Sequence, residues 1–229
     1  MRQKIINFHF NNIQKNIFCV SDKNNFAFNL INSWPKWGNK NIFIYGPKSC
    51  GKTSIAKIWS QKSNALFLNS SFFKKFSTEK IQKLIKDKSC WILDDFDELM
   101  ISKNKIEEKV LNFLNMINEK NDFLLITSKK APKFNNIKIK DLHSRISSFI
   151  VVEVKEPDDL LLKQIILKNL KEKQIIMPER SLKFLLKVID RTYTSAFLIS
   201  KRIDEKSLEH KTKISIEFIK RDLLKVGVQ

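Results

Sequence analysis

Short apolar runs alternate with longer segments of mixed polarity through the first two thirds of the chain. A run that is apolar at nearly every position is typical of a strand buried on both faces of a parallel sheet, whereas apolar residues at every third or fourth position are typical of a helix. The predicted strands are 41–45, 65–68, 90–93, 123–127 and 149–154. The predicted helices are 26–34, which precedes the first strand, and 54–59, 78–86 and 106–118, which lie between strands. This alternation predicts an α/β domain in which helices cover both faces of a parallel sheet.

After Pro157 the pattern changes, because only helical periodicity remains. The helices predicted there are 158–172, 179–190, 194–209 and 215–224. We therefore expect three parts: an N-terminal segment at 1–25, an α/β domain at 26–156 and a small all-helical domain at 157–229.

The most informative motif runs from Gly46 to Thr53 and has the spacing G-x-x-x-x-G-K-[ST]. It lies between a predicted strand and a predicted helix, which is the context that a phosphate-binding loop requires. Its backbone N–H groups and the helix N-terminus would bind phosphate, while the lysine reaches the outer phosphates and the hydroxyl binds Mg²⁺. The predicted nucleotide contacts are Gly46, Pro47, Lys48, Ser49, Cys50, Gly51, Lys52, Thr53 and Ser54, with Thr53 also a metal ligand. An ordinary glycine turn before a helix is the alternative.

Two acidic residues, Asp94 and Asp95, follow the third predicted strand. A phosphate-binding loop needs an acidic partner for Mg²⁺, which Asp94 would hold through water. Asp95 is placed to orient an attacking water as a catalytic residue. Alternatively the pair only caps the next element, since Asp97 and Glu98 show that acids are common here.

Arg145 precedes the fifth predicted strand. In an oligomeric ATPase, an arginine at this place points at the nucleotide of a neighbour and stabilises the charge of the transition state. A surface arginine without such a role is the alternative.

The formal net charge is +19, but the lysines are spread along the predicted helices rather than bunched into one arm. This distribution favours a solvated lysine surface over a dedicated DNA groove, with nonspecific affinity for polyanions at low salt. The sequence has no apolar run long enough to span a membrane and no signal-peptide pattern. Its cysteines, Cys19, Cys50 and Cys90, form no spaced framework. We expect a cytoplasmic protein that does not contact membranes.

Four segments resemble the AAA+ domain of the DnaA family in order and spacing, and the helical end resembles the lid domain of that family. The segments are Gly46–Thr53, Ile92–Asp95, Leu125–Pro132 and Leu142–Arg145. The resemblance covers nearly the whole chain. It implies an AAA+ P-loop fold with a helical lid that binds ADP or ATP with Mg²⁺.

Within this family the chain is most similar to the Hda-type regulatory inactivators of DnaA, and Ser33–Trp37 resembles their α-proteobacterial members. Because the sequence ends at Gln229, just after the lid, we expect no C-terminal DNA-binding domain of the DnaA type. The N-terminal peptide is similar to the one by which this group docks onto the DNA polymerase sliding clamp, with predicted contacts Gln3, Ile5, Ile6 and Phe8. Such apolar anchors suit a groove, while a first strand or a frayed terminus is the alternative.

The chain departs from the family at two nucleotide-sensing positions. Lys129 stands where the family has an acidic residue, and Thr194 stands where the family has an arginine. Arg191 and Arg202 are near Thr194, but neither aligns with the missing arginine. These departures put ATP hydrolysis by the chain itself in question, whereas the match at Arg145 is intact.

The resemblance implies a negative regulator of replication initiation. It would bind adenine nucleotide, dock on the sliding clamp (the beta subunit of the polymerase) and stimulate ATP hydrolysis by DnaA through Arg145. It would contact DNA only indirectly or nonspecifically, and a homodimer is left open. One alternative is an AAA+ ATPase that uses its own Asp95, as a helicase loader or a DnaA-like initiation factor. Another is a basic nucleic-acid-binding module in which nucleotide has only a structural role.

Overall fold

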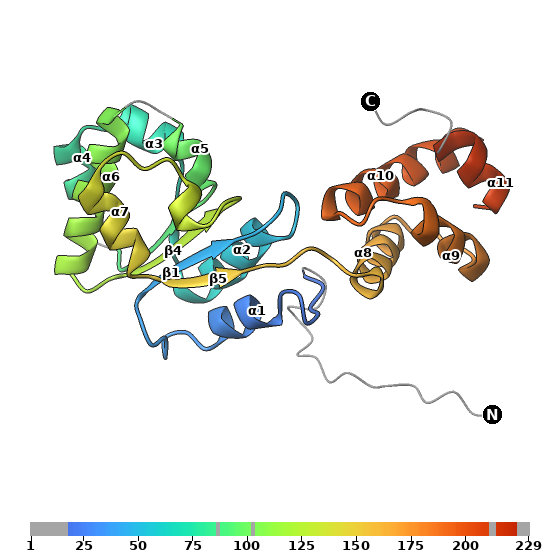
Figure 1. Cartoon of the computed structure of the whole chain (residues 1–229), viewed down its shortest axis with the longest axis horizontal. Coiled ribbons are helices and arrows are strands. Elements are labelled where there is room, and N and C mark those ends of the chain that lie inside the picture. Colours follow the sequence, from blue (N-terminus) through green and yellow to red (C-terminus); the bar gives the residue numbers. More distant parts are fainter. Residues whose placement is uncertain (1–17, 86–87, 102–103, 211–213, 224–229) are drawn as a thin grey trace.

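The structure is a computed structural model that describes residues 18–85, 88–101, 104–210 and 214–223 of the 229-residue chain. The predicted clamp-binding residues Gln3, Ile5, Ile6 and Phe8 lie outside the described residues. Figure 1 shows two regions, an α/β region and a helical region that follows the last strand.

Five parallel strands form one sheet in the order β2-β3-β4-β1-β5. The strands are β1 (Asn41–Tyr45), β2 (Leu66–Leu68), β3 (Cys90–Leu93), β4 (Phe123–Ser128) and β5 (Ile150–Glu153). In the register, Phe43 of β1 lies between Ile126 of β4 and Val151 of β5. The predicted parallel sheet is therefore confirmed, and the carboxyl ends of its strands meet at one edge, where α/β proteins bind ligands.

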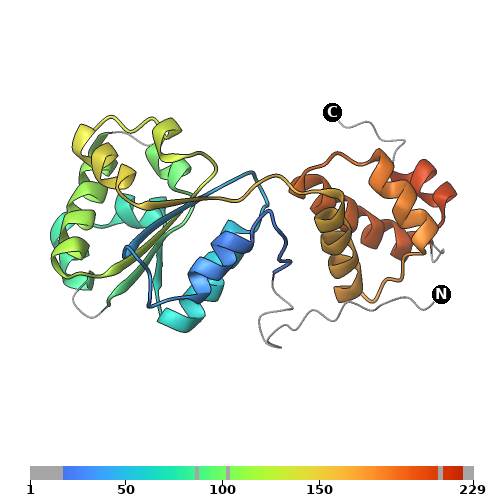
Figure 2. The same ribbon diagram turned by 60° about the horizontal axis from the view of Figure 1, so that its bottom comes forward.

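Successive side chains of each strand point to opposite faces of the sheet and join two separate cores. On one face, Phe43 and Trp91 pack with apolar residues of α3 to α7. On the other face, Ile42 and Ile92 pack with apolar residues of α1 and α2. Figures 1 and 2 show these helices on opposite sides of the sheet, as the sequence predicted. The helices of this region are α1 (Asn25–Asn32), α2 (Lys52–Ser63), α3 (Ser70–Lys75), α4 (Thr78–Ile85), α5 (Phe96–Met100), α6 (Asn104–Glu119), α7 (Lys140–Ser147) and the 3-10 turn η1 (Pro132–Phe134).

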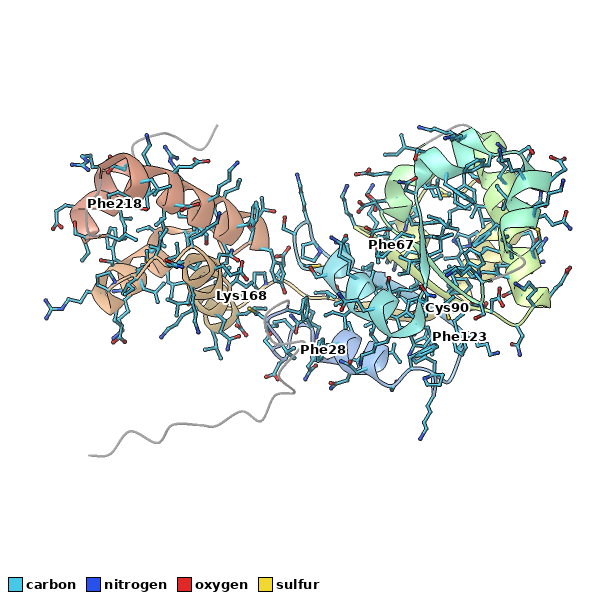
Figure 3. The ribbon with its side chains drawn as sticks, turned by 180° about the vertical axis from the view of Figure 1, so that it is seen from behind. Phe28, Phe67, Cys90, Phe123, Lys168 and Phe218 are labelled. Atoms are coloured by element: carbon cyan, nitrogen blue, oxygen red, sulfur yellow. The ribbon has the colours of Figure 1, made fainter. Side chains whose placement is uncertain are left out.

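The helical region has a core of its own, to which Leu170, Leu185 and Phe218 contribute. Its elements are α8 (Asp159–Glu172), α9 (Glu179–Val188), α10 (Tyr193–His210), α11 (Ile216–Phe218) and η2 (Ile219–Leu223). Tyr193 connects the two regions, because its ring packs in the core of α1 and α2 and its hydroxyl donates to the carbonyl of Lys155 at 3.0 Å. In Figure 3 Phe218 lies in the helical region, whereas Phe28 and Phe123 lie in the α/β region.

The observed elements differ from the predicted ones mainly where they are short. Helices α3 and α5 have only 6 and 5 residues, too few to establish a periodic pattern in the sequence. Helix α7, which has 8 residues, was also not predicted. The predicted helix 215–224 is a short α-helix followed by a π-helical turn, η2. Within the described residues, none of the helices is long and apolar enough to cross a membrane.

Candidate nucleotide-binding site

The loop between β1 and α2 has a backbone that only glycine fits at two positions. A Cβ atom on Gly46 would lie 2.4 Å from the carbonyl oxygen of Val154, and one on Gly51 would lie 2.3 Å from Cε2 of Phe18. Gly51 also has a φ of 90°, which side chains disfavour. The loop therefore curves closely around the N-terminus of α2, whose first N–H groups have no partner within the helix.

Lys52 is buried at the start of α2, with 6% of its surface exposed. Its ammonium donates to the carbonyl oxygens of Gly46 at 3.0 Å and Pro47 at 2.8 Å. No ion pair with a carboxylate is found for Lys52 among the described residues. A buried cation that has only neutral acceptors is costly unless an anion joins it, so this arrangement fits a bound phosphate.

Cys50 lies beside this lysine, with its Sγ 3.6 Å from the ammonium nitrogen. Burial raises the pKa of the Cys50 thiol, even though the charge of Lys52 acts in the opposite direction. The thiol is therefore protonated at neutral pH and packs within the loop rather than acting as a nucleophile.

Thr53 and Asp94, the predicted metal ligands, lie in direct contact. The Thr53 hydroxyl donates to the Asp94 carboxylate at 3.0 Å, and Thr127 of β4 donates to the same carboxylate. Thr127 also accepts the backbone N–H of Asp95 at 3.1 Å. The described residues contain no group of three or more His, Cys, Asp or Glu that could hold a metal by itself. A hydroxyl beside a single carboxylate suits Mg²⁺, which completes its coordination with phosphate oxygens and water.

Asp95 lies at the edge of the cavity in a left-handed conformation, with φ 51° and ψ 52°. Burial raises the pKa of the Asp95 carboxyl, and the charges of Asp94 and Glu98 raise it further. Lys129 acts in the opposite direction. The Lys129 ammonium lies 2.7 Å from Glu98 and 3.5 Å from Asp97.

Several of the side chains described above, among them Lys52, Thr53 and Asp95, line one part of a cavity of about 520 Å³. We call this part the phosphate end; its members are Lys48, Ser49, Cys50, Gly51, Lys52, Thr53, Ser54, Asp95, Glu98 and Lys129. The remaining lining residues form the far end, which comprises Phe18, Cys19, Asn24, Ile165, Lys168, Asn169, Tyr193 and Phe197. Figure 3 shows Lys168 on α8, on the side of the helical region that faces the α/β region. The far end was not predicted, because its residues come from three separate stretches of the chain and carry no motif.

Arg145 lies on α7 and is not among the residues that line this cavity. Its Nε donates to both carboxylate oxygens of Asp141 at 3.2 Å, and its side chain is 36% exposed. The other candidate cation, Arg191, pairs with Asp159 at 2.7 Å. Thr194 contacts the phosphate-binding loop, since its hydroxyl lies 3.4 Å from that of Ser49.

The chain is similar to known proteins in sequence and in fold. The sequence model of the family "ATPase family associated with various cellular activities (AAA)" matches residues 42–154. The chromosomal replication initiator protein DnaA of Buchnera aphidicola subsp. Cinara cedri is 23% identical over 200 residues, which are 81% of this chain and 46% of that protein. The chain spans about half the length of the curated DnaA relatives that it matches.

Two solved structures have the same fold. Domain III of the Thermotoga maritima replication initiation protein DnaA superposes with a TM-score of 0.76 at 19% identity, covering 89% of this chain and 92% of that one. AMPPCP-bound DnaA from Aquifex aeolicus gives a TM-score of 0.69 at 21% identity, covering 85% of this chain and 66% of that one.

The family match over residues 42–154, the five-stranded parallel sheet and the loop before α2 together define an AAA+ fold. Within this fold class the chain is distantly similar to DnaA in sequence and in structure.

Proposed function

We propose that this chain binds an adenine nucleotide with Mg²⁺ and acts in the initiation of DNA replication as a DnaA-like AAA+ ATPase. The observation that carries the proposal is the contact between Thr53 and Asp94 beside the buried ammonium of Lys52. Loop, lysine, hydroxyl and carboxylate are the set that a magnesium-bound triphosphate requires. The relation to replication initiators, one of them solved with AMPPCP, supports the nucleotide and the process.

The residues that carry this proposal have separate roles. The loop N–H groups and Lys52 bind phosphate oxygens, and Thr53 with Asp94 orients the metal, which offsets phosphate charge when bound. Asp95 accepts the proton of the attacking water, and Thr127 fixes the backbone of Asp95 at the cavity.

The test is calorimetric titration of the whole chain with ADP and with AMPPCP in the presence of Mg²⁺. Lys52→Ala should weaken the binding of both nucleotides by about 10–100-fold, because a hydrogen bond to a charged group contributes about 1.5–3 kcal/mol. Lys57→Ala, which removes an exposed lysine of the same helix, is the matched control and should bind like the wild type. Wild-type protein that binds neither nucleotide would overturn the proposal.

Steady ATP turnover by the wild type, lost in Asp95→Asn, is expected for an initiation ATPase that uses its own site. No detectable turnover despite tight binding would remove the ATPase part of the proposal and leave nucleotide binding.

We also infer a narrower function, in which the chain regulates DnaA by placing Arg145 at ATP held by DnaA. Its support is the position of Arg145, which is partly exposed and does not line the cavity of its own chain. Among the described residues, the Arg145 guanidinium pairs with Asp141 of the same helix alone. The neutral Thr194 in place of an arginine supports action on ATP in another chain. Docking on the sliding clamp through the peptide that begins at Gln3 belongs to this proposal and concerns residues outside those described.

This function is tested with ATP-loaded DnaA, sliding clamp and DNA. Arg145→Ala should abolish the stimulated hydrolysis, since arginine fingers contribute about 10³–10⁵ in rate. Lys140→Ala, at the exposed first position of the same helix, should leave the stimulation intact. Equal hydrolysis with wild type and Arg145→Ala would exclude the finger, and unchanged clamp pull-down by Gln3→Ala would exclude the docking peptide.

A further inference from the structure

Helix α6 carries a buried acid that does not belong to the nucleotide-binding cavity. Glu107 is 1% exposed, and no charged side chain among the described residues is more deeply buried. Its neighbours on the buried face of α6 are apolar, among them Val110 and Leu114. An acid in an apolar core is costly unless it makes hydrogen bonds, so the partners of Glu107 indicate what it does.

These partners are two backbone N–H groups at the start of α7. Oε2 of Glu107 accepts from Lys138 and from Ile139, each at 2.9 Å. Ile139 is the N-cap residue of α7, and its side chain makes no capping hydrogen bond. Figure 1 shows α6 and α7 side by side. Glu107 therefore binds the N-cap N–H from a neighbouring helix, as the glutamate of a capping box does within one helix.

Stability alone does not explain an acid at this position. Oε1 of Glu107 is buried and has no hydrogen-bond partner among the described residues. A buried oxygen without a partner costs stability, and an apolar side chain of the same shape avoids that cost. What an apolar side chain cannot supply is the pair of directional bonds to the start of α7.

A short series of contacts leads from Glu107 to Arg145. Glu107 holds the N–H of Ile139, and α7 begins one residue later, at Lys140. Asp141, in the first turn of this helix, accepts from Nε of Arg145 at 3.2 Å. The residue that fixes the start of α7 therefore also fixes the carboxylate against which the arginine lies.

The apolar contacts of α7 leave this position less well defined. Leu142 and Ile146 are fully buried in the core and determine which face of α7 points inward. Hydrophobic contacts are not directional, whereas hydrogen bonds weaken steeply when their length or angle changes. The bonds from Glu107 therefore determine the position of α7 along its own axis.

We propose that Glu107 is the positioning residue for Arg145, because it fixes the start of the helix that presents this arginine to ATP in another chain. The proposal rests on the narrower function proposed above, in which Arg145 acts on ATP held by DnaA. It assigns control of the arginine to a side chain that does not line the cavity of this chain.

The first test measures hydrolysis of DnaA-bound ATP in the presence of sliding clamp and DNA. Glu107→Leu should lower the maximal stimulated rate by about 10–100-fold, because a small displacement of a catalytic group has an effect of this size. The protein concentration that gives half of the stimulation should stay within about twofold, since the docking surfaces are unchanged. Glu107→Gln keeps an acceptor oxygen and should retain most of the rate.

Glu108→Leu is the matched control, because it makes the same change at an exposed neighbouring residue of α6. It should stimulate hydrolysis like the wild type. Equal rates with wild type and Glu107→Leu, or an equal loss in Glu107→Gln, would overturn the proposal. A loss of AMPPCP binding in Glu107→Leu would show that the acid supports the whole fold, and would overturn the proposal as well.

Amide hydrogen exchange without DnaA provides the second test. Glu107→Leu should speed exchange in residues 138–147 by about tenfold and leave exchange in α2 unchanged, whereas Glu107→Gln should resemble the wild type. Unchanged exchange in residues 138–147 would overturn the anchoring of α7. Wild-type protein that stimulates no hydrolysis would overturn the function proposed for Arg145, and hydrogen exchange would still decide whether Glu107 anchors α7.

Discussion

The two ends of the cavity are built in different ways. At the phosphate end, Thr53 of α2 donates to Asp94, which follows β3, and the same carboxylate accepts from Thr127 of the buried strand β4. At the far end, residues from the N-terminal stretch meet residues of α8 and α10, and the regions are connected by side chains such as Tyr193. The phosphate end is therefore rigid, whereas the far end depends on how the helical region lies against the sheet. Affinity for phosphate therefore depends mainly on the α/β region, whereas contacts at the far end depend on the placement of the helical region.

Gly51 is where the two ends touch, so Gly51→Ala is the most severe test of the comparison. The new Cβ would lie 2.3 Å from the Phe18 ring at a φ of 90°, so both a clash and backbone strain arise. We expect the free energy of unfolding to fall by about 2–4 kcal/mol, measured by urea denaturation.

Gly38→Ala is the control for this substitution, because nothing lies within 4 Å of a Cβ atom there. It should change the unfolding free energy by less than about 0.5 kcal/mol. Similar losses of unfolding free energy in the two variants would show that the contact between the loop and Phe18 does not contribute to stability.

Thr127→Val tests the rigidity of the phosphate end. Thr127 is fully buried, and without its hydroxyl both the Asp94 carboxylate and the Asp95 N–H lose a partner. The unfolding free energy should fall by about 1–3 kcal/mol, and nucleotide affinity should fall with it. Thr127→Ser keeps the hydroxyl and should retain most of the stability and most of the nucleotide affinity. If valine and serine behave alike, the loss comes from packing and not from the hydrogen bonds.

Phe197→Ala tests the far end, where Phe197 lines the cavity although it is 56% exposed. ADP affinity should fall by about three- to tenfold, because an apolar contact with the nucleotide is lost, while stability changes little. Leu198→Ala is the matched control, since this neighbour is 57% exposed and does not line the cavity. Equal binding by both variants would show that α10 does not contribute to the site.

The same contrast explains what the sequence could predict. The phosphate end could be predicted because its signals are local in the sequence. The motif from Gly46 to Thr53 directly follows one apolar strand, and Asp94 directly follows another. Thr127 was missed as part of the site, although a polar residue that ends a buried strand at the binding edge is a readable signal. Phe18 and Phe197 were missed because they are 179 positions apart (197 − 18), and only the tertiary fold brings them to one cavity. The short helices α3 and α5 carry too few residues for a periodic signal.

Asp95→Asn gives the smallest expected effect, and its dependence on pH identifies the cause. Because burial and neighbouring acids raise the pKa of Asp95 in the folded state, folding favours the protonated carboxyl and is opposed by ionisation. The destabilisation appears as the pH rises through the raised pKa and is absent below the ordinary value of 3.8. Asparagine, which also tolerates the left-handed backbone, should therefore stabilise the protein at pH 7 and progressively less as the pH falls toward that value. The gain should be at most about 0.5 kcal/mol, because solvent screens the partly exposed carboxylate. Asp190→Asn makes the same change in net charge at an exposed loop position and is the control in thermal unfolding at each pH. A gain in stability of the same size at every pH would show that the effect comes from the backbone conformation of residue 95 and not from ionisation of the Asp95 carboxyl. The phosphate end would then store backbone strain instead of electrostatic energy.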